Sequence, residues 1–145
     1  MGEVRPGGRV YLRRSKGATV IAAAWRHWPC LFTQHRPGRK HDRPIVLADW
    51  QRTIVEEHPE ALLRGLFHSE GCRVTNWTVR PVAGALKRYE YGRYFFTNES
   101  TDIMRIATDT LDRLAIPWRP TNRDTISVAR REGVAAVDRF VGPKY

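Results

Sequence analysis

The sequence is poor in cysteine, with two in 145 residues, and it has no long uninterrupted apolar run. A disulfide scaffold needs more cysteines than this, so Cys30 and Cys72 are predicted to be reduced thiols. A membrane-spanning helix needs about 18 consecutive apolar residues, and a secretory signal needs an apolar stretch near the start. Neither pattern is present, so we expect a cytoplasmic protein that does not enter a membrane.

Acidic residues are scarce relative to basic ones, with 15 Asp and Glu against 25 Lys and Arg and a formal net charge of +10. Residues 1–47 hold ten basic and two acidic residues, a net of +8, whereas residues 48–145 hold fifteen and thirteen, a net of +2. The chain therefore divides into a basic N-terminal extension, 1–47, and a nearly neutral body, 48–145. Such an excess attracts polyanions, so nucleic acid is the first partner to consider. An acidic protein or RNA is the alternative.

The N-terminal extension is predicted to begin with two short strands between Arg9 and Trp25, joined by a turn at residues 15–17. Residues 26–44 contain three prolines and one glycine, which exclude a long helix or strand. In this loop, Arg39 and Lys40 belong to a basic run that we expect to contact phosphate groups.

The same loop carries a possible zinc site, with the spacing C-x4-H-x5-H formed by Cys30, His35 and His41. His27 or Cys72 would be the fourth ligand of a structural Zn²⁺ ion. The spacing departs from that of standard zinc fingers. The preferred interpretation is therefore a loop held by packing of its apolar side chains, which are Trp28, Leu31 and Phe32.

The body alternates between helical and strand patterns. A helix capped by Asp49 is followed by a second helix with Pro59 in its first turn. Strands are predicted at 73–80 and 88–97, with a turn over 81–87. Ser100 or Asn98 then caps a helix, and the chain ends with strands at 116–119 and 125–129 and a last helix. The order α-β-β-α-β-β-α predicts an α+β fold with an antiparallel sheet.

The second of these helices contains the stretch LLRGLFHSEGC, residues 62–72, which has a glycine in its middle. Ala61, Gly65 and Ser69 follow at spacings of four and form a stripe of small side chains, with Leu66 beside it. Such a stripe lets two helix backbones approach closely, so these residues are predicted to form a dimer interface. Gly71 is predicted to end the helix in a left-handed conformation.

Glu70 is the last residue of this predicted helix, where the helix dipole disfavours a carboxylate and favours a cation. In a symmetric pair of such helices, two carboxylates would meet near one axis. Two carboxylates together with phosphate oxygens suit a divalent metal such as Mg²⁺. The alternative is a core helix that ends on an exposed glutamate.

The segment LRGLFHSEG, residues 63–71, resembles the signature helix of the LAGLIDADG homing endonucleases, in the form found in intein-type members. Glycine stands at its third and ninth positions and an acid at its eighth. The family's core domain has the order αββαββα, and the residues around 97–116 and 140–144 also resemble it. The resemblance covers about residues 58–145.

This resemblance implies a homing-endonuclease-like fold that binds duplex DNA across a saddle-shaped sheet. Members with one motif act as homodimers, and the eighth-position acid, here Glu70, binds Mg²⁺ for phosphodiester cleavage. In the strand after Gly71, alternate residues point to opposite faces of the sheet, and Trp77 and Val79 should face the helices. The residues predicted to face DNA are Asn76, Thr78, Arg80, Thr125 and Ser127.

The sequence also departs from the family pattern. His68 stands at the sixth motif position, where aspartate is usual. Family nucleases place a basic residue near the metal, and the candidates here are Arg130, as the catalytic choice, and Arg131. A catalytically inactive DNA-binding transcriptional regulator with the same fold is therefore the alternative function.

Overall fold

The chain has an α+β fold with antiparallel sheets, as the sequence predicted. The structure is a computed structural model that describes residues 7–31, 39 and 44–142. It divides into two compact units, Met1–His35 and Arg36–Tyr145. The division falls within the loop that precedes the predicted body, and residues 44–48 belong to the larger unit. There the Ile45 backbone N–H donates to Asp102 Oδ2 at 2.8 Å.

The smaller unit contains the predicted hairpin, formed by β1 (Tyr11–Ser15) and β2 (Ala18–Ala22). Its two-residue turn has positive φ angles at Lys16 (49°) and Gly17 (80°), a conformation whose twist matches that of the strands. One helical turn, α1 (Trp28–Leu31), follows. Trp28 donates from Nε1 to the Ala23 carbonyl at 3.0 Å and packs edge-on against Trp25.

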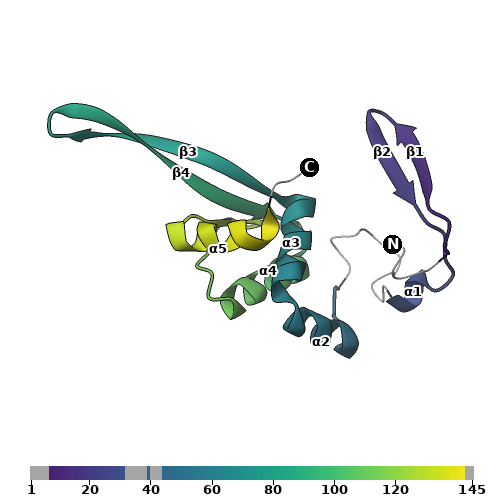
Figure 1. Cartoon of the computed structure of the whole chain (residues 1–145). Coiled ribbons are helices and arrows are strands. Elements are labelled where there is room, and N and C mark those ends of the chain that lie inside the picture. Colours follow the sequence, from purple (N-terminus) through teal and green to yellow (C-terminus); the bar gives the residue numbers. More distant parts are fainter. Residues whose placement is uncertain (1–6, 32–38, 40–43, 143–145) are drawn as a thin grey trace. The chain divides into compact units, whose positions relative to one another are not determined.

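The larger unit holds the remaining elements, which Figure 1 labels along the chain. They are α2 (Asp49–Glu57), α3 (Pro59–Glu70), β3 (Gly71–Val82), β4 (Ala85–Thr97), α4 (Thr101–Arg113), β5 (Arg119–Asn122), β6 (Thr125–Val128) and α5 (Arg131–Val141). From α3 onward the order is αββαββα, which confirms the prediction. Within the described ranges, no helix has the length and apolarity that a membrane crossing requires.

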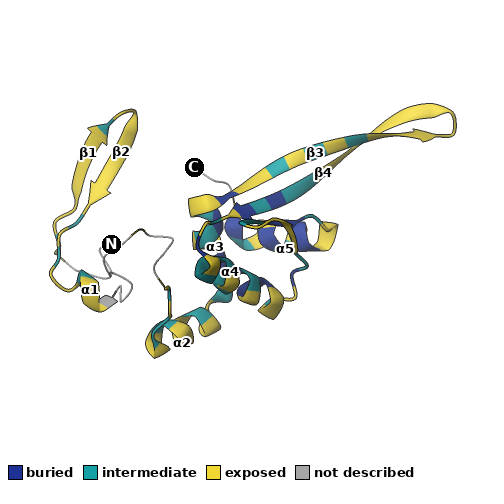
Figure 2. Cartoon of the chain, turned by 180° about the vertical axis from the view of Figure 1, so that it is seen from behind, coloured by how far each residue is buried: buried dark blue, intermediate teal, exposed yellow. Residues whose placement is uncertain are grey.

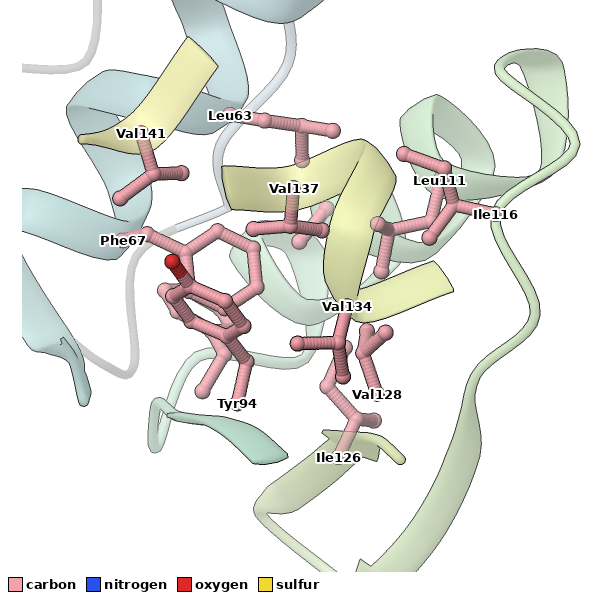
Figure 3. Close-up of a cluster of buried hydrophobic side chains, with 12 residues drawn as sticks. Leu63, Phe67, Tyr94, Leu111, Ile116, Ile126, Val128, Val134, Val137 and Val141 are labelled. Carbon is pink, nitrogen blue, oxygen red and sulfur yellow. The ribbon is translucent and has the colours of Figure 1, made fainter. Parts of the chain in front are cut away.

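The core lies between the helices and one face of a four-stranded sheet with the order β3-β4-β6-β5. Tyr94 pairs with Val128 and Phe96 with Ile126, so these four side chains share that face. The Phe67 ring from α3 meets Tyr94 edge-on at a centroid distance of 5.4 Å. Figure 3 shows valines of α5 and leucines of α3 and α4 closing over this layer. The buried side chains are Leu63, Phe67, Tyr94, Phe96, Ala107, Leu111, Ile116, Ile126, Val128, Val134, Val137 and Val141.

The hairpin of β3 and β4 is longer than predicted. Its turn is the two residues Ala83 and Gly84, with φ angles of 51° and 81°, rather than residues 81–87. Because β6 pairs with β4 only over Tyr94–Thr97, residues 74–93 form a two-stranded arm that extends beyond the helices (Figure 1). At about 3.3 Å per residue, its nine residues on β3 span about 30 Å.

The length of the arm overturns one prediction about packing. Trp77 and Val79 lie on the helix-side face of β3, but Trp77 is 59% exposed and Val79 is 42% exposed. No helix reaches this part of the hairpin, and Figure 2 shows the arm mostly exposed while the base is buried. Trp77 contacts Arg88 of the neighbouring strand, whose guanidinium carbon lies 4.9 Å from its ring centroid.

Two element boundaries differ from the sequence prediction, and the cap of α4 is one of the two residues predicted. Asp49 is the first residue of α2 rather than its cap, and Gln51 Oε1 accepts from the Ala48 backbone N–H at 3.0 Å. The cap of α4 is Ser100, whose Oγ accepts from the Ile103 N–H at 3.4 Å. The fifth strand begins at Arg119 and not at Ile116, because Ile116 packs into the core instead.

Candidate nucleic-acid interface

The sheet has one face against the helices and one open face, and strand register assigns each residue to a face. Asn76, Thr78 and Arg80 pair with Tyr91, Tyr89 and Lys87. All six residues occupy strand positions that alternate with the positions of the core side chains. They therefore lie on the open face, as the period-two pattern predicted. This row runs along the arm and combines amide, hydroxyl and cationic groups with two tyrosine rings.

The outer part of the row forms a shallow pocket. Thr78, Arg80, Tyr89 and Tyr91 line a hollow of about 650 Å³ together with Pro81 and Val82. The Lys87 ammonium nitrogen lies 5.6 Å from the Tyr89 ring centroid, within the range of a cation–π contact. Among the described residues, neither Arg80 nor Lys87 forms an ion pair with a carboxylate, so both can meet a polyanion.

Thr125 and Ser127 of β6 lie on the same open face, since they pair with Thr97 and Phe95. Thr125 Oγ1 is 3.0 Å from Thr97 Oγ1, so its hydroxyl is engaged across the strands. Ser127 is only 2% exposed, which corrects the prediction that it projects freely toward a ligand. Ser127 lies in the wall of a second pocket, which Pro117, Trp118 and Arg119 also line.

Glu70 ends α3 as predicted and is exposed, and Asn98 Nδ2 donates a hydrogen bond to its Oε2. The next residue, Gly71, is extended (φ −92°, ψ 162°), so the predicted left-handed end of this helix is wrong. A glycine is needed at position 71 because a larger residue would overlap Phe67. A Cβ on Gly71 would lie 2.5 Å from Phe67 Cδ1.

The described residues of one chain gather no set of metal ligands around Glu70. In the described part of the chain, no three His, Cys, Asp or Glu side chains lie close enough together to hold a metal ion. Arg130 is also separated from Glu70. Gly71 pairs with Phe96, Val128 pairs with Tyr94, and Arg130 lies two residues further along. Because β3 and β6 flank β4, the strand ends next to Glu70 and Arg130 are separated by two strand spacings, about 10 Å.

The stripe of small residues on α3 is open to solvent. Ala61, Gly65 and Ser69 are exposed, and a Cβ added to Gly65 would meet nothing within 4 Å. Ser69 Oγ donates to the Leu66 carbonyl at 2.9 Å, and the Leu66 side chain packs against the core. Among the described residues, no helix packs closely against Gly65.

His68 of the motif and Arg73 of β3 have structural partners that the sequence did not indicate. His68 Nε2 lies 2.7 Å from the Val141 carbonyl oxygen, so it donates to the end of α5. Arg73 binds Asp138 through Nε at 2.8 Å and a terminal nitrogen at 3.1 Å. Tyr94 Oη donates to the same carboxylate at 2.6 Å. Arg73 and Asp138 are 65 positions apart in the chain, so the sequence carries no local signal of this contact.

These contacts change three pKa values, and the hydrogen bond to Asp138 raises that of Arg73. Burial, followed by the hydrogen bond to Asp138, raises the pKa of Tyr94 to about 12. The hydrogen bond from Arg73 lowers the pKa of Asp138. Asp138 is therefore a carboxylate at neutral pH that joins α5 to the base of the arm.

The N-terminal candidates are only partly within the described residues. Cys30 is an exposed free thiol and Arg39 is exposed. His35, Lys40 and His41 lie outside the described residues, and so does Phe32. The proposed Zn²⁺ site and the phosphate-binding run therefore remain predictions from the sequence.

Comparison with known proteins adds no family assignment. No protein-family model matches the chain, and no curated protein matches it significantly. The likeness to LAGLIDADG homing endonucleases therefore rests on the motif at residues 63–71 and the order of the elements.

Proposed function

We propose that this protein binds duplex DNA across the open face of its four-stranded sheet and, as a homodimer, cleaves it in a metal-dependent reaction. The observation that carries the proposal is the row formed by Asn76, Thr78 and Arg80 with their partners on β4. The row follows a sheet face that the helices leave uncovered.

The arm has dimensions and chemistry that suit a DNA groove. The major groove is about 12 Å wide and admits a two-stranded ribbon. An Asn side chain pairs well with adenine and an Arg side chain with guanine or phosphate. Asn76 and Arg80 are four residues apart on one face, about 13 Å along the strand. They would therefore reach different base pairs.

Cleavage would depend on two copies of α3. One chain supplies a single carboxylate, Glu70, at the end of the exposed stripe of Ala61, Gly65 and Ser69. Packing of two such stripes would bring the two Glu70 side chains together as oxygen ligands for Mg²⁺. When bound, the ion would supply Lewis-acid stabilisation of the phosphodiester. Arg130 is far from Glu70 of its own chain, so a catalytic role for it would also require the second copy.

A non-cleaving DNA-binding regulator is the second candidate. It is favoured by the hydrogen bond from Asn98 to Glu70, which already satisfies one carboxylate oxygen. In this alternative, Glu70 holds the loop before α4, and the sheet face recognises DNA without cleaving it.

A cleavage selection distinguishes the two candidates. The purified protein would be incubated with a randomised duplex library, in Mg²⁺ and in EDTA, and bound and cut molecules would be sequenced separately. We expect cut ends in Mg²⁺ at a partly palindromic site, their loss in Glu70→Gln, and unchanged binding by that variant. Glu60→Gln, in the first turn of the same helix, is the matched control. An enriched but intact site would favour the regulator, and no enriched duplex would contradict both.

The homodimer has a separate test. Gly65→Leu should weaken self-association in sedimentation by at least tenfold, because a leucine would hold the two helices apart. Arg64→Leu adds the same side chain to the neighbouring exposed position and should weaken it less. Equal effects of the two variants would argue against pairing through the stripe.

A further inference from the structure

The second pocket on the open face is lined by two residues whose buried side-chain donors lack partners. Among the described residues, the buried side-chain atoms without a hydrogen-bond partner are Arg93 Nε and Ser127 Oγ. Both residues line the same pocket of about 470 Å³, beside Arg119 and Arg130. A buried donor without an acceptor is costly, and such atoms in native proteins commonly mark a missing partner.

The pocket has a strongly positive lining. Three arginines contribute to it, and none of its described lining residues is acidic. Arg93 is held in place by Phe95, whose ring centroid lies 5.5 Å from the guanidinium carbon. A guanidinium Nε–H can only donate. The missing partner is therefore an acceptor, and the three cations favour an anion.

The other walls of the pocket are formed by two aromatic and two small apolar side chains. Trp118 and Tyr91 line it together with Pro117 and Ala129. The Trp118 indole N–H already donates to Asp112 Oδ1 at 2.7 Å, so this ring offers only apolar surface. The volume exceeds that of a lone phosphate and leaves room for an attached sugar or base.

We propose that this pocket binds the phosphate group of a nucleotide, with Arg93 Nε and Ser127 Oγ as buried donors and Arg119 and Arg130 as cations at its rim. Arginine suits phosphate because its planar fork matches two phosphate oxygens. The phosphate would belong to the backbone of bound DNA, a source that rests on the proposed function, or to a free nucleotide.

The experiment separates the pocket from the DNA proposal. The full chain, labelled with ¹⁵N, would be titrated with inorganic phosphate and with a nucleoside monophosphate. The resonances of Arg93 Nε–H and the Ser127 amide should shift on saturation. Ser127→Ala and Arg119→Gln should each weaken binding at least fivefold, whereas Arg105→Gln on the exposed side of α4 should leave it unchanged. Ser127→Ala should also raise the urea midpoint of unfolding, because it removes an unsatisfied buried hydroxyl.

Duplex binding at several salt concentrations identifies the source of the phosphate. If the pocket holds a backbone phosphate, Arg119→Gln should reduce the slope of log K against log salt by about 0.9, the value for one lost contact. Phosphate binding without any duplex binding would support the pocket, with a free nucleotide as its ligand, and contradict the proposed function. Duplex binding with no phosphate-induced shifts, and with Arg119→Gln behaving like Arg105→Gln, would overturn the pocket and leave the proposed function standing. Because Arg119 is exposed, its variant keeps the test valid if Ser127→Ala fails to fold.

Discussion

Asn98 Nδ2 donates to Glu70 Oε2, and Asn98 Oδ1 accepts from the Ser100 backbone N–H at 2.9 Å. One amide therefore joins the carboxyl end of α3 to the capping residue of α4. The carboxylate that the motif singles out is consequently positioned by a residue 28 positions away, at the end of β4.

This relationship predicts energetic coupling between the two residues. Asn98→Asp keeps an acceptor for Ser100 but places a second carboxylate against Glu70, and should cost about 1–2 kcal/mol. Adding Glu70→Gln returns an amide donor to the pair. We expect the double variant to be more stable than the sum of the single effects by at least about 0.5 kcal/mol in urea unfolding. Strict additivity would show that the bond contributes nothing in solution.

The two glycines of the motif should respond oppositely to alanine. Gly71→Ala should destabilise the chain by about 1–3 kcal/mol, because the new methyl group would overlap the Phe67 ring. Gly65→Ala should stabilise it by up to about 1 kcal/mol, since its helical position is open and alanine favours helices. Thermal unfolding of dilute protein would measure both effects. A stabilised Gly71→Ala variant would contradict the packing at this helix end.

Stability should fall at alkaline pH through Tyr94. Its pKa is raised to about 12 in the folded chain, against about 10 for a free tyrosine. The stabilisation is thus complete below pH 10 and is lost as the pH rises from 10 to about 12. Tyr94→Phe should lose less stability than the wild type over this range, although it is less stable at pH 7. Tyr89→Phe, on the arm, should follow the wild type, and identical alkaline profiles for all three would refute the assignment.

Ala83, in the turn of the arm, has a strained backbone conformation that a substitution could relieve. Ala83 has a φ angle of 51°, in the left-handed region that disfavours residues with a Cβ other than asparagine and aspartate. Ala83→Asn should stabilise the arm by about 0.5–1 kcal/mol. Hydrogen exchange of arm amides should therefore slow relative to the wild type, whereas Ala85→Asn, within the strand, should not slow it. Faster exchange in Ala83→Asn would mean that the turn has a different geometry.

Local patterns in the sequence were sufficient to predict the elements. Pro59 and the leucine spacing predict α3, and alternation along residues 73–80 predicts a strand with Asn76, Thr78 and Arg80 on one face. Each of these signals depends on neighbours within a few residues. The length of the hairpin was not predicted, because Ala83 and Gly84 give a weaker turn signal in the sequence than Pro81 does. Pro81 therefore suggested a turn that begins too early.

The sequence by itself determined the fold class, the order of the elements and the face on which each strand residue lies, because these follow from local periodicity and from the chemistry of proline and glycine. Only the tertiary structure decided that Trp77 is exposed, that Ser127 is buried beside Arg93, and that Glu70 is bound to Asn98. These facts depend on which segments meet in space. Residues that meet across 28 to 65 positions of chain leave no periodic trace in the sequence.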